Sequence, residues 1–255
     1  MTPDALKKFP AAAIKGSRFF LRIVYKINYI MKQDKNDDNG FNQLSIDEFK
    51  RIIEQGSLLI DARNSFEFTN GFIPGSIFIG IDGKLAEWAK NLVPAQEQIV
   101  FVANEGKEEE VFISLKNAGF LNIAGYLEGG FTSWTNAGED IDLVIDIEAD
   151  ELAMDLPFEE NLLVLDVRQP EEYAEGHVKD ALNIPLKDMT DLALIAGFDE
   201  DQTIYIHCAA GYRSVIAASI LKKEGYHNLR NIIGGFEKIK EQKTITIEKD
   251  SSLLN

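Results

Sequence analysis

Short runs of consecutive apolar residues alternate along the chain with segments of helical periodicity. The apolar runs predict strands at Leu58 to Asp61, Ser76 to Ile79, Ile99 to Ala103, Leu162 to Val167, Ala181 to Ile184 and Thr203 to Cys208. Helical spacing is found at Asp82 to Asn91, Lys107 to Asn117 and from about Arg213 to Lys223. Strands that are apolar throughout are typical of a parallel sheet with helices on both faces. We therefore predict an α/β fold whose ligands bind at the carboxyl ends of the strands.

The same pattern occurs twice, with a constant offset of 105 positions between matching residues. The matched positions are Asp61 and Asp166, Arg63 and Arg168, Glu67 and Glu172, Gly71 and Gly176, Gly106 and Gly211, and Gly129-Gly130 and Gly234-Gly235. A constant offset over so many matches indicates an internal repeat. We predict a basic, partly helical segment and linker at 1–40, a first domain at 41–140 and a second at 141–255. Each domain would be a small parallel sheet covered by helices.

Glycines occur at corresponding places in both halves. Gly119 and Gly225 fall where helices are expected to stop, which suits the residue after a helix C-terminus. The two Gly-Gly-Phe triplets, at 129–131 and 234–236, predict tight turns from strand to helix. We assign all of these glycines structural roles.

The 255 residues carry a formal charge of −16, which is unevenly distributed. Residues 1–40 hold eight Lys/Arg and four Asp/Glu, a net of +4, which leaves −20 for the rest. The acidic body argues against binding to nucleic acid or an anionic membrane, because both would repel it. The apolar run Phe19 to Met31 is interrupted by Arg22 and Lys26 and is too short to span a bilayer. Docking on a neighbouring domain is the simpler interpretation of its apolar face, and attachment to a membrane surface is the alternative.

Candidate chemistry concentrates at the only cysteine, Cys208. It ends a predicted strand and is followed by Ala209, Ala210 and Gly211, whose side chains are too small to crowd a loop with inward-pointing amides. Such a nest of N–H groups at a helix N-terminus binds anions and would favour a nucleophilic thiolate. A single cysteine forms no internal disulfide, so a reducing cytoplasm is the simplest compartment.

The second half resembles a rhodanese (sulfurtransferase) domain along its length. The resemblance rests on Asp166-Val-Arg-Gln-Pro-Glu-Glu-Tyr-Ala-Glu-Gly-His177, on Ala181-Leu-Asn-Ile-Pro185, on Cys208-Ala-Ala-Gly-Tyr-Arg213 and on Gly234-Gly-Phe236. The first half is similar too. Its segments Gly71 to Lys84, Glu105 to Glu109 and Gly125 to Gly130 resemble the tandem rhodanese region that follows the metallo-β-lactamase domain in persulfide dioxygenase fusions. That metal-binding domain is absent, since three histidines provide no His-x-His-x-Asp-His cluster.

The resemblance implies a sulfurtransferase in which Cys208 takes sulfane sulfur from a small anionic donor and passes it to a thiophilic acceptor such as sulfite, cyanide or a thiol. Backbone amides of Ala209, Ala210, Gly211, Tyr212 and Arg213 would form the cradle, with the Tyr212 side chain shaping the entrance. Arg213 would hold an anionic donor or favour the thiolate. Ser214 would either donate to sulfur or cap the helix.

Other conspicuous side chains near the loop are expected to be structural. Asp166 and Arg168 would form a buried strand-end ion pair that organises it, and His207 would be packed and hydrogen-bonded. His177 is also assigned a structural role, and His227 is expected at the surface. No metal or other cofactor is expected, because candidate ligands lack the required spacing.

The first half departs from the family's pattern at the site. Ala103 and Glu108 replace Cys208 and Arg213, in the acidic segment Asn104 to Glu110. That loop has no nucleophile and would repel an anion, so we predict a non-catalytic domain that supports the second by packing.

Two alternatives remain open from the sequence. Ile206-His-Cys followed by Arg213-Ser resembles the cysteine phosphatase signature, but four residues lie between Cys208 and Arg213 where those phosphatases have five. The other is a non-enzymatic tandem module that binds a partner protein. The donor is open as well, since Ala209 stands where thiosulfate-specific rhodaneses often have a basic residue. The narrower resemblance favours a low-molecular-weight persulfide over thiosulfate, and names a separate persulfide dioxygenase as a candidate partner.

Overall fold

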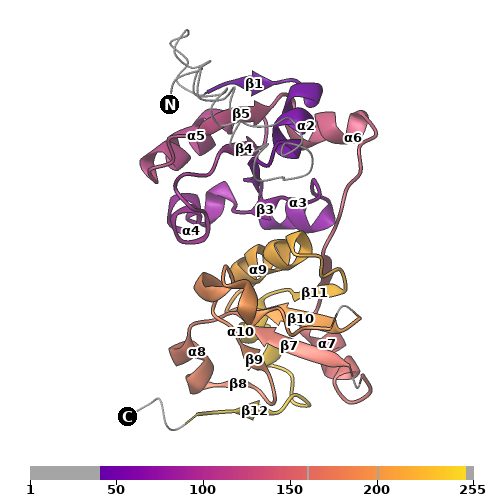
Figure 1. Ribbon diagram of the computed structural model, residues 1–255. Helices are drawn as coiled ribbons and strands as arrows, with labels where there is room; N and C mark the ends of the chain where they lie inside the picture. The colour runs from indigo at the N-terminus through magenta and orange to yellow at the C-terminus, as the bar shows by residue number, and fades with distance from the viewer. Residues whose placement is uncertain (1–40, 160, 200, 251–255) are drawn as a thin grey trace, which may run out of the picture.

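The structure is a computed structural model that describes residues 41–159, 161–199 and 201–250. The basic segment 1–40 lies outside the described residues, as does the predicted apolar helix within it. The described chain forms two halves, each built on one five-stranded parallel sheet flanked by helices (Figure 1). This confirms the predicted α/β class. Among the described residues, no helix combines the length and apolarity needed to cross a bilayer.

The two sheets have the same topology, which shows that the sequence repeat is also a structural one. In the first, the spatial order is β1 (Gln43–Leu44), β5 (Ile123–Leu127), β4 (Ile99–Val102), β2 (Leu58–Asp61) and β3 (Ile77–Phe78). In the second, it is β6 (Ile145–Ile147), β11 (Leu229–Ile232), β10 (Thr203–His207), β7 (Leu162–Asp166) and β9 (Leu182–Asn183). A separate pair, β8 (His177–Val178) and β12 (Ile247–Glu248), runs antiparallel.

The helices follow a similar order in the two halves, except that α4 (Leu85–Leu92) of the first half is replaced by 3₁₀ turns in the second. The first half contains α2 (Ile46–Glu54), α3 (Ser65–Asn70), α4 (Leu85–Leu92), α5 (Glu108–Asn117) and α6 (Gly130–Asn136), with a 3₁₀ turn η3 (Ile81–Gly83). The second contains α7 (Ala149–Asp155), α8 (Pro170–Glu175), α9 (Tyr212–Lys223) and α10 (Gly235–Ile239), with 3₁₀ turns η4 (Leu186–Asp188) and η5 (Leu192–Leu194).

The helix predicted at 82–91 begins three residues later than expected, as α4 (Leu85–Leu92). The 3₁₀ turn η3 occupies its first residues, and Lys84 then adopts a left-handed conformation with φ 64°, which separates the turn from α4. Sequence reasoning also missed the amphipathic helix α2, although Ser45 and Glu48 form the capping box that marks such a start. Gly119 and Gly225 do follow helix ends with positive φ, and the Gly-Gly-Phe triplets begin α6 and α10 as predicted.

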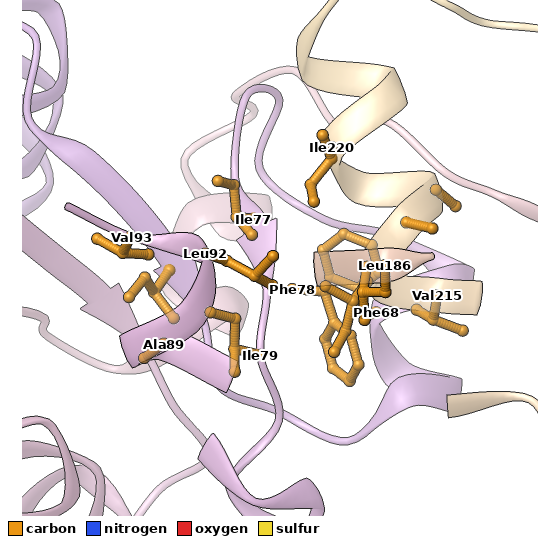
Figure 2. Close-up of a cluster of buried hydrophobic side chains, with 14 of the residues drawn as sticks. Phe68, Ile77, Phe78, Ile79, Ala89, Leu92, Val93, Leu186, Val215 and Ile220 are labelled. Atoms are coloured by element: carbon orange, nitrogen blue, oxygen red, sulfur yellow. The ribbon is translucent and has the colours of Figure 1, made fainter. Parts of the chain in front are cut away.

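One hydrophobic cluster runs through both halves, because α9 packs against the first sheet as well as its own (Figure 1). Figure 2 shows Phe68 and Phe78 of the first half beside Leu186 and Val215 of the second. These four side chains are at most 2% exposed. Two smaller clusters fill the outer faces of the sheets. The two halves therefore share a core.

Candidate functional site

Cys208 lies directly after β10, at the carboxyl end of the second sheet, and before the start of α9. Its side chain is 1% exposed. The Gly211 amide donates to Cys208 Sγ at 3.1 Å, and Ser214 Oγ lies 3.8 Å from the same sulfur. Gly211 has φ 100°, a left-handed conformation that glycine adopts without strain. The loop thus turns back and directs an amide at the sulfur.

The carbonyls of this loop are held on the side of α10. Phe236 N–H donates to the Cys208 carbonyl at 2.7 Å, and Glu237 N–H donates to the Ala209 carbonyl at 3.2 Å. A Cβ atom at Gly235 would overlap the Cys208 carbonyl oxygen, so only glycine permits this approach. In a trans peptide, the N–H points opposite to the C=O. The Ala209 and Ala210 amides therefore point away from α10, and neither donates to an acceptor among the described residues.

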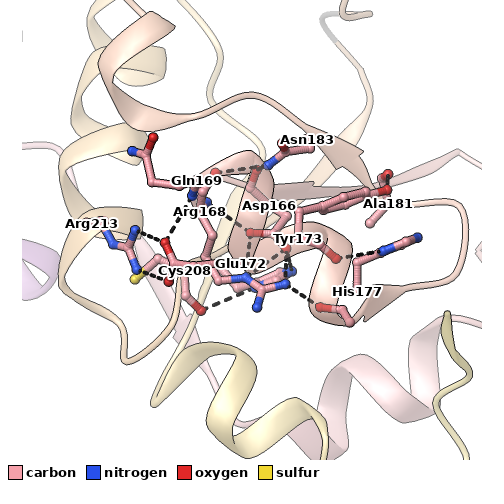
Figure 3. Close-up of polar contacts among 12 residues, drawn as sticks. Asp166, Arg168, Gln169, Glu172, Tyr173, His177, Ala181, Asn183, Cys208 and Arg213 are labelled. Atoms are coloured by element: carbon pink, nitrogen blue, oxygen red, sulfur yellow. Dashed lines mark hydrogen bonds and ion pairs between the residues drawn. The ribbon is translucent and has the colours of Figure 1, made fainter. Parts of the chain in front are cut away.

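Arg213 forms a bidentate ion pair with Glu172 of α8 (Figure 3). Its Nη1 and Nη2 lie 2.7 and 2.8 Å from the two carboxylate oxygens. The hydrogen bonds from Arg213 hold the pKa of Glu172 below its ordinary value, and Glu172 in turn raises the pKa of Arg213. The nearby Cys208 raises the pKa of Arg213 further, after the larger effect of Glu172. Sequence reasoning quoted Glu172 in a motif but missed it as the partner of Arg213.

The expected buried ion pair between Asp166 and Arg168 is present at the end of β7 (Figure 3). Arg168 Nε lies 3.0 Å from both carboxylate oxygens and Nη2 lies 2.6 Å from Oδ2. Nη2 also donates to the Gly176 carbonyl at 2.7 Å, and the guanidinium stacks 3.9 Å from the Phe236 ring centroid. The pair therefore ties β7 to the end of α8 and to α10, which contacts the Cys208 loop.

Asn183 is a second residue that sequence reasoning left without a role. Its side-chain amide donates to the carbonyls of Asp166 and Arg168, at 2.9 and 3.0 Å. The signal was available in the Ala181 to Pro185 motif, since a polar side chain that ends an apolar strand often binds nearby backbone. Asn183 thus fixes the segment that presents Arg168.

His207 is fully buried, with Nδ1 at 3.3 Å from the Cys208 carbonyl. Its Nε2 has no hydrogen-bond partner in the described part of the chain and lies 3.7 Å from Asp166 Oδ2. Burial lowers the pKa of His207, so the ring is neutral at physiological pH. The other two histidines differ in setting, since His177 is buried and stacked on Tyr173, and His227 is exposed.

The Tyr212 side chain leaves the second half and lies on the first. Its hydroxyl donates to the Gly80 carbonyl at 3.1 Å, and its ring meets Phe78 edge-on at 5.5 Å between centroids. Ser214 donates to the Gly211 carbonyl at 3.0 Å, so it makes no N-cap bond to an amide. The loop therefore contacts the first half through Tyr212 and its own turn through Ser214.

The first half repeats the scaffold without the cysteine. Arg63 pairs with Asp61, donates to the Gly71 carbonyl at 2.7 Å and stacks 3.9 Å from the Phe131 ring, matching its counterpart in the second half. At the loop, however, Ala103 takes the place of Cys208, and Glu67 accepts a bond from Asn104 at 2.9 Å where Glu172 binds an arginine. The two loops share a scaffold and differ in their chemistry.

The fold and the loop agree with a match to the rhodanese-like domain family. The model of that family matches residues 45–137 and 148–242, which together are most of the chain. The chain belongs to the rhodanese-like family, with two copies of the domain in tandem.

The individual relatives described here each match less than half of this chain. A thiosulfate sulfurtransferase, PspE of Escherichia coli, is 40% identical over 75 residues, which are 29% of this chain and 71% of that protein. A sulfurtransferase of Allochromatium vinosum is 31% identical over 93 residues, 36% of this chain and 85% of that one. Among solved structures, a rhodanese-like domain protein of Staphylococcus aureus is 28% identical, with 42% of this chain and 100% of that chain covered and a TM-score of 0.37.

Proposed function

We propose that the protein is a sulfurtransferase and that Cys208 carries the transferred sulfur. The observation that carries this proposal is the Gly211 amide directed at Cys208 Sγ at 3.1 Å, at the carboxyl end of a parallel sheet. A hydrogen bond from an amide favours the charged form of a sulfur over its protonated form. The same amide would help to stabilise the negative charge of a Cys208 persulfide.

The reaction proceeds in two displacements. In the first, the Cys208 thiolate attacks the outer sulfur of thiosulfate, a new S–S bond forms at Cys208, and sulfite leaves with the electron pair of the broken S–S bond. In the second, an acceptor such as cyanide attacks the terminal sulfur, thiocyanate forms and the Cys208 thiolate is restored. With a low-molecular-weight persulfide as donor, the leaving group is the corresponding thiolate. No external oxidant or reductant is needed.

The loop amides and Arg213 would bind the anions. The Ala209 and Ala210 amides, which have no acceptor among the described residues, could donate to a terminal sulfur or to donor oxygens. Arg213 is already paired with Glu172, so much of its positive charge is compensated. Its proposed role is therefore to orient the loop as well as to attract an anionic donor. This arrangement supports recognition of a small donor through backbone amides, as proposed for either thiosulfate or glutathione persulfide.

The experiment is intact-mass spectrometry of the full chain after incubation with each donor. Because Cys208 is the only cysteine, a gain of one sulfur atom reports on a single site. We expect the gain with at least one donor, its removal by cyanide or sulfite, and its absence in Cys208→Ser. A chain that gains no sulfur from thiosulfate, glutathione persulfide or 3-mercaptopyruvate would contradict the proposal. Cys208-dependent hydrolysis of an aryl phosphate in that same chain would favour a phosphatase instead.

A further inference from the structure

Tyr212 connects the Cys208 loop to the first half of the molecule. It is the first residue of α9, between Gly211, which donates to Cys208 Sγ, and Arg213, which binds Glu172. Its own side chain makes none of these contacts. The hydroxyl donates instead to the carbonyl of Gly80, and the ring packs on Phe78.

Gly83, the last residue of η3, provides the space for the Tyr212 ring. A Cβ atom at Gly83 would overlap the phenol ring at Cζ, Cε2 and the hydroxyl. The backbone of Gly83 does not lie in the left-handed region, so its conformation places no demand for glycine. Position 83 therefore requires glycine because any larger side chain would overlap the Tyr212 ring.

The contact is partly buried, and a second polar contact lies further along the same helix. Burial raises the pKa of Tyr212, so its hydroxyl stays protonated as the donor to Gly80. Seven residues further along α9, on the same helix face, Ser219 accepts a hydrogen bond from the Phe78 amide at 3.0 Å. Phe78 belongs to β3, an edge strand whose free amides require partners. Two polar contacts thus fasten α9 to the first half.

The position of Tyr212 in the chain makes this contact relevant to the sulfur. The Gly211 amide and the Arg213 side chain are its covalent neighbours, so a shift of Tyr212 moves both. Displacements of about 1 Å in an active site can reduce rates by about a hundredfold. The hydrogen bond and the ring contact of the Tyr212 side chain are both made with the half that lacks a cysteine.

We propose that Tyr212 is a positioning residue through which the first half sets the geometry of the Cys208 loop. Phe78, Gly80 and Gly83 form its seat. This inference rests on the proposed sulfur transfer by Cys208, and assigns the first half a role in the rate of that reaction in addition to its role in packing. The expected consequence is that a substitution in the first half slows sulfuration of a cysteine in the second.

The test is Gly83→Ala in the full-length chain, with the single-turnover rate of Cys208 sulfuration measured by intact mass. We expect a rate lower by about tenfold or more, because the added methyl group displaces the ring. The matched control is Gly197→Ala, where a Cβ atom meets no other atom within 4 Å and φ is not left-handed. The control should react as the wild type does. All rates are taken well below the melting temperature of each variant, where a loss of stability alone leaves the rate unchanged.

A double-mutant cycle separates positioning from general damage. Tyr212→Ala should also slow sulfuration about tenfold, and adding Gly83→Ala to it should cause no further loss, because the methyl group then occupies vacated space. Tyr212→Phe keeps the ring in its seat and should recover most of the rate, within about threefold of wild type, as expected for loss of one neutral hydrogen bond. Additive effects of the two alanine substitutions would overturn the proposal.

The outcomes distinguish this inference from the proposed function. If the wild-type chain gains no sulfur from any donor, the sulfurtransferase proposal fails. If the wild type gains sulfur and folded Gly83→Ala gains it equally fast, the proposed function stands and the positioning role of Tyr212 is wrong. If Gly83→Ala does not fold, Tyr212→Ala and Tyr212→Phe decide the question, and equal rates for these two variants would overturn the inference.

Discussion

The two halves have the same sheet order and the same buried ion pair, yet their corresponding helices α5 and α9 are packed very differently. In α5, Val111 and Leu115 are buried and Ile113 is 48% exposed. In α9, every residue from Ser214 to Leu221 is buried, because one face packs on its own sheet and the other on the first half. Duplicated domains can therefore differ in the burial of a helix as well as in the residues of a loop. The half with the cysteine is the half whose loop helix is enclosed.

The largest effect is expected from moving the nucleophile between the halves. In the double variant Cys208→Ser with Ala103→Cys, the cysteine occupies the matching position after β4. We expect no gain of sulfur by intact mass, because the first loop carries Glu105 and Glu108 and lacks an arginine. A gain of sulfur by the cysteine introduced at position 103 would show that the shared scaffold suffices, and would break the comparison.

A large loss of stability is expected when the repeated ion pair is broken in either half. Arg63→Ala and Arg168→Ala each leave a buried aspartate without its partner, which costs about 3–5 kcal/mol. Chemical denaturation should give similar losses for the two variants, since the contacts match. Arg168→Ala should also slow sulfuration of the protein that remains folded, because Arg168 holds Phe236 beside the Cys208 loop. Equal sulfuration rates in the two variants would contradict that link.

A moderate effect is expected at matching positions of the two helices. Ala218 of α9 is fully buried, and Ile113 of α5 is its counterpart in the repeat. Ala218→Leu overpacks the shared core and should lower the free energy of unfolding by about 1–3 kcal/mol. Ile113→Leu, on a half-exposed position, should change it by less than about 0.5 kcal/mol. Similar values for both would show that α9 is less enclosed than its contacts indicate.

The smallest effect concerns acid pH and Glu172. Its pKa in the folded protein is below the ordinary carboxyl value because of the bonds from Arg213. The pair therefore contributes its full stability above the ordinary pKa and loses it as the pH falls through the lowered folded pKa. Glu172→Gln should flatten the melting-temperature profile in that acid range and leave the profile near neutral pH parallel to wild type. An unchanged acid slope would show that the pair is too exposed to matter.

The repeat made much of the fold predictable from the sequence, whereas the contacts between the halves could not be predicted. Strands β2, β7 and β10 were located within a residue, since buried parallel strands are continuously apolar. Short edge strands such as β1 and β6, with two or three residues each, give no such signal. The ion pair of Asp166 with Arg168 was predicted from local spacing. The partner of Arg213 was not, because Glu172 lies 41 positions away and local spacing does not show which of the three glutamates in α8 faces the arginine.

By itself, the sequence determined the fold class, the duplication, the single cysteine and the alanine at the matching position 103, because these depend on residue type and spacing. Only the tertiary structure decided what each loop residue contacts. It placed Arg213 on Glu172 and the Tyr212 ring over Gly83, from a half of the chain about 130 residues earlier. The physical reason is that these contacts arise from how two packed sheets share the helix α9, and no local pattern of residues encodes that arrangement.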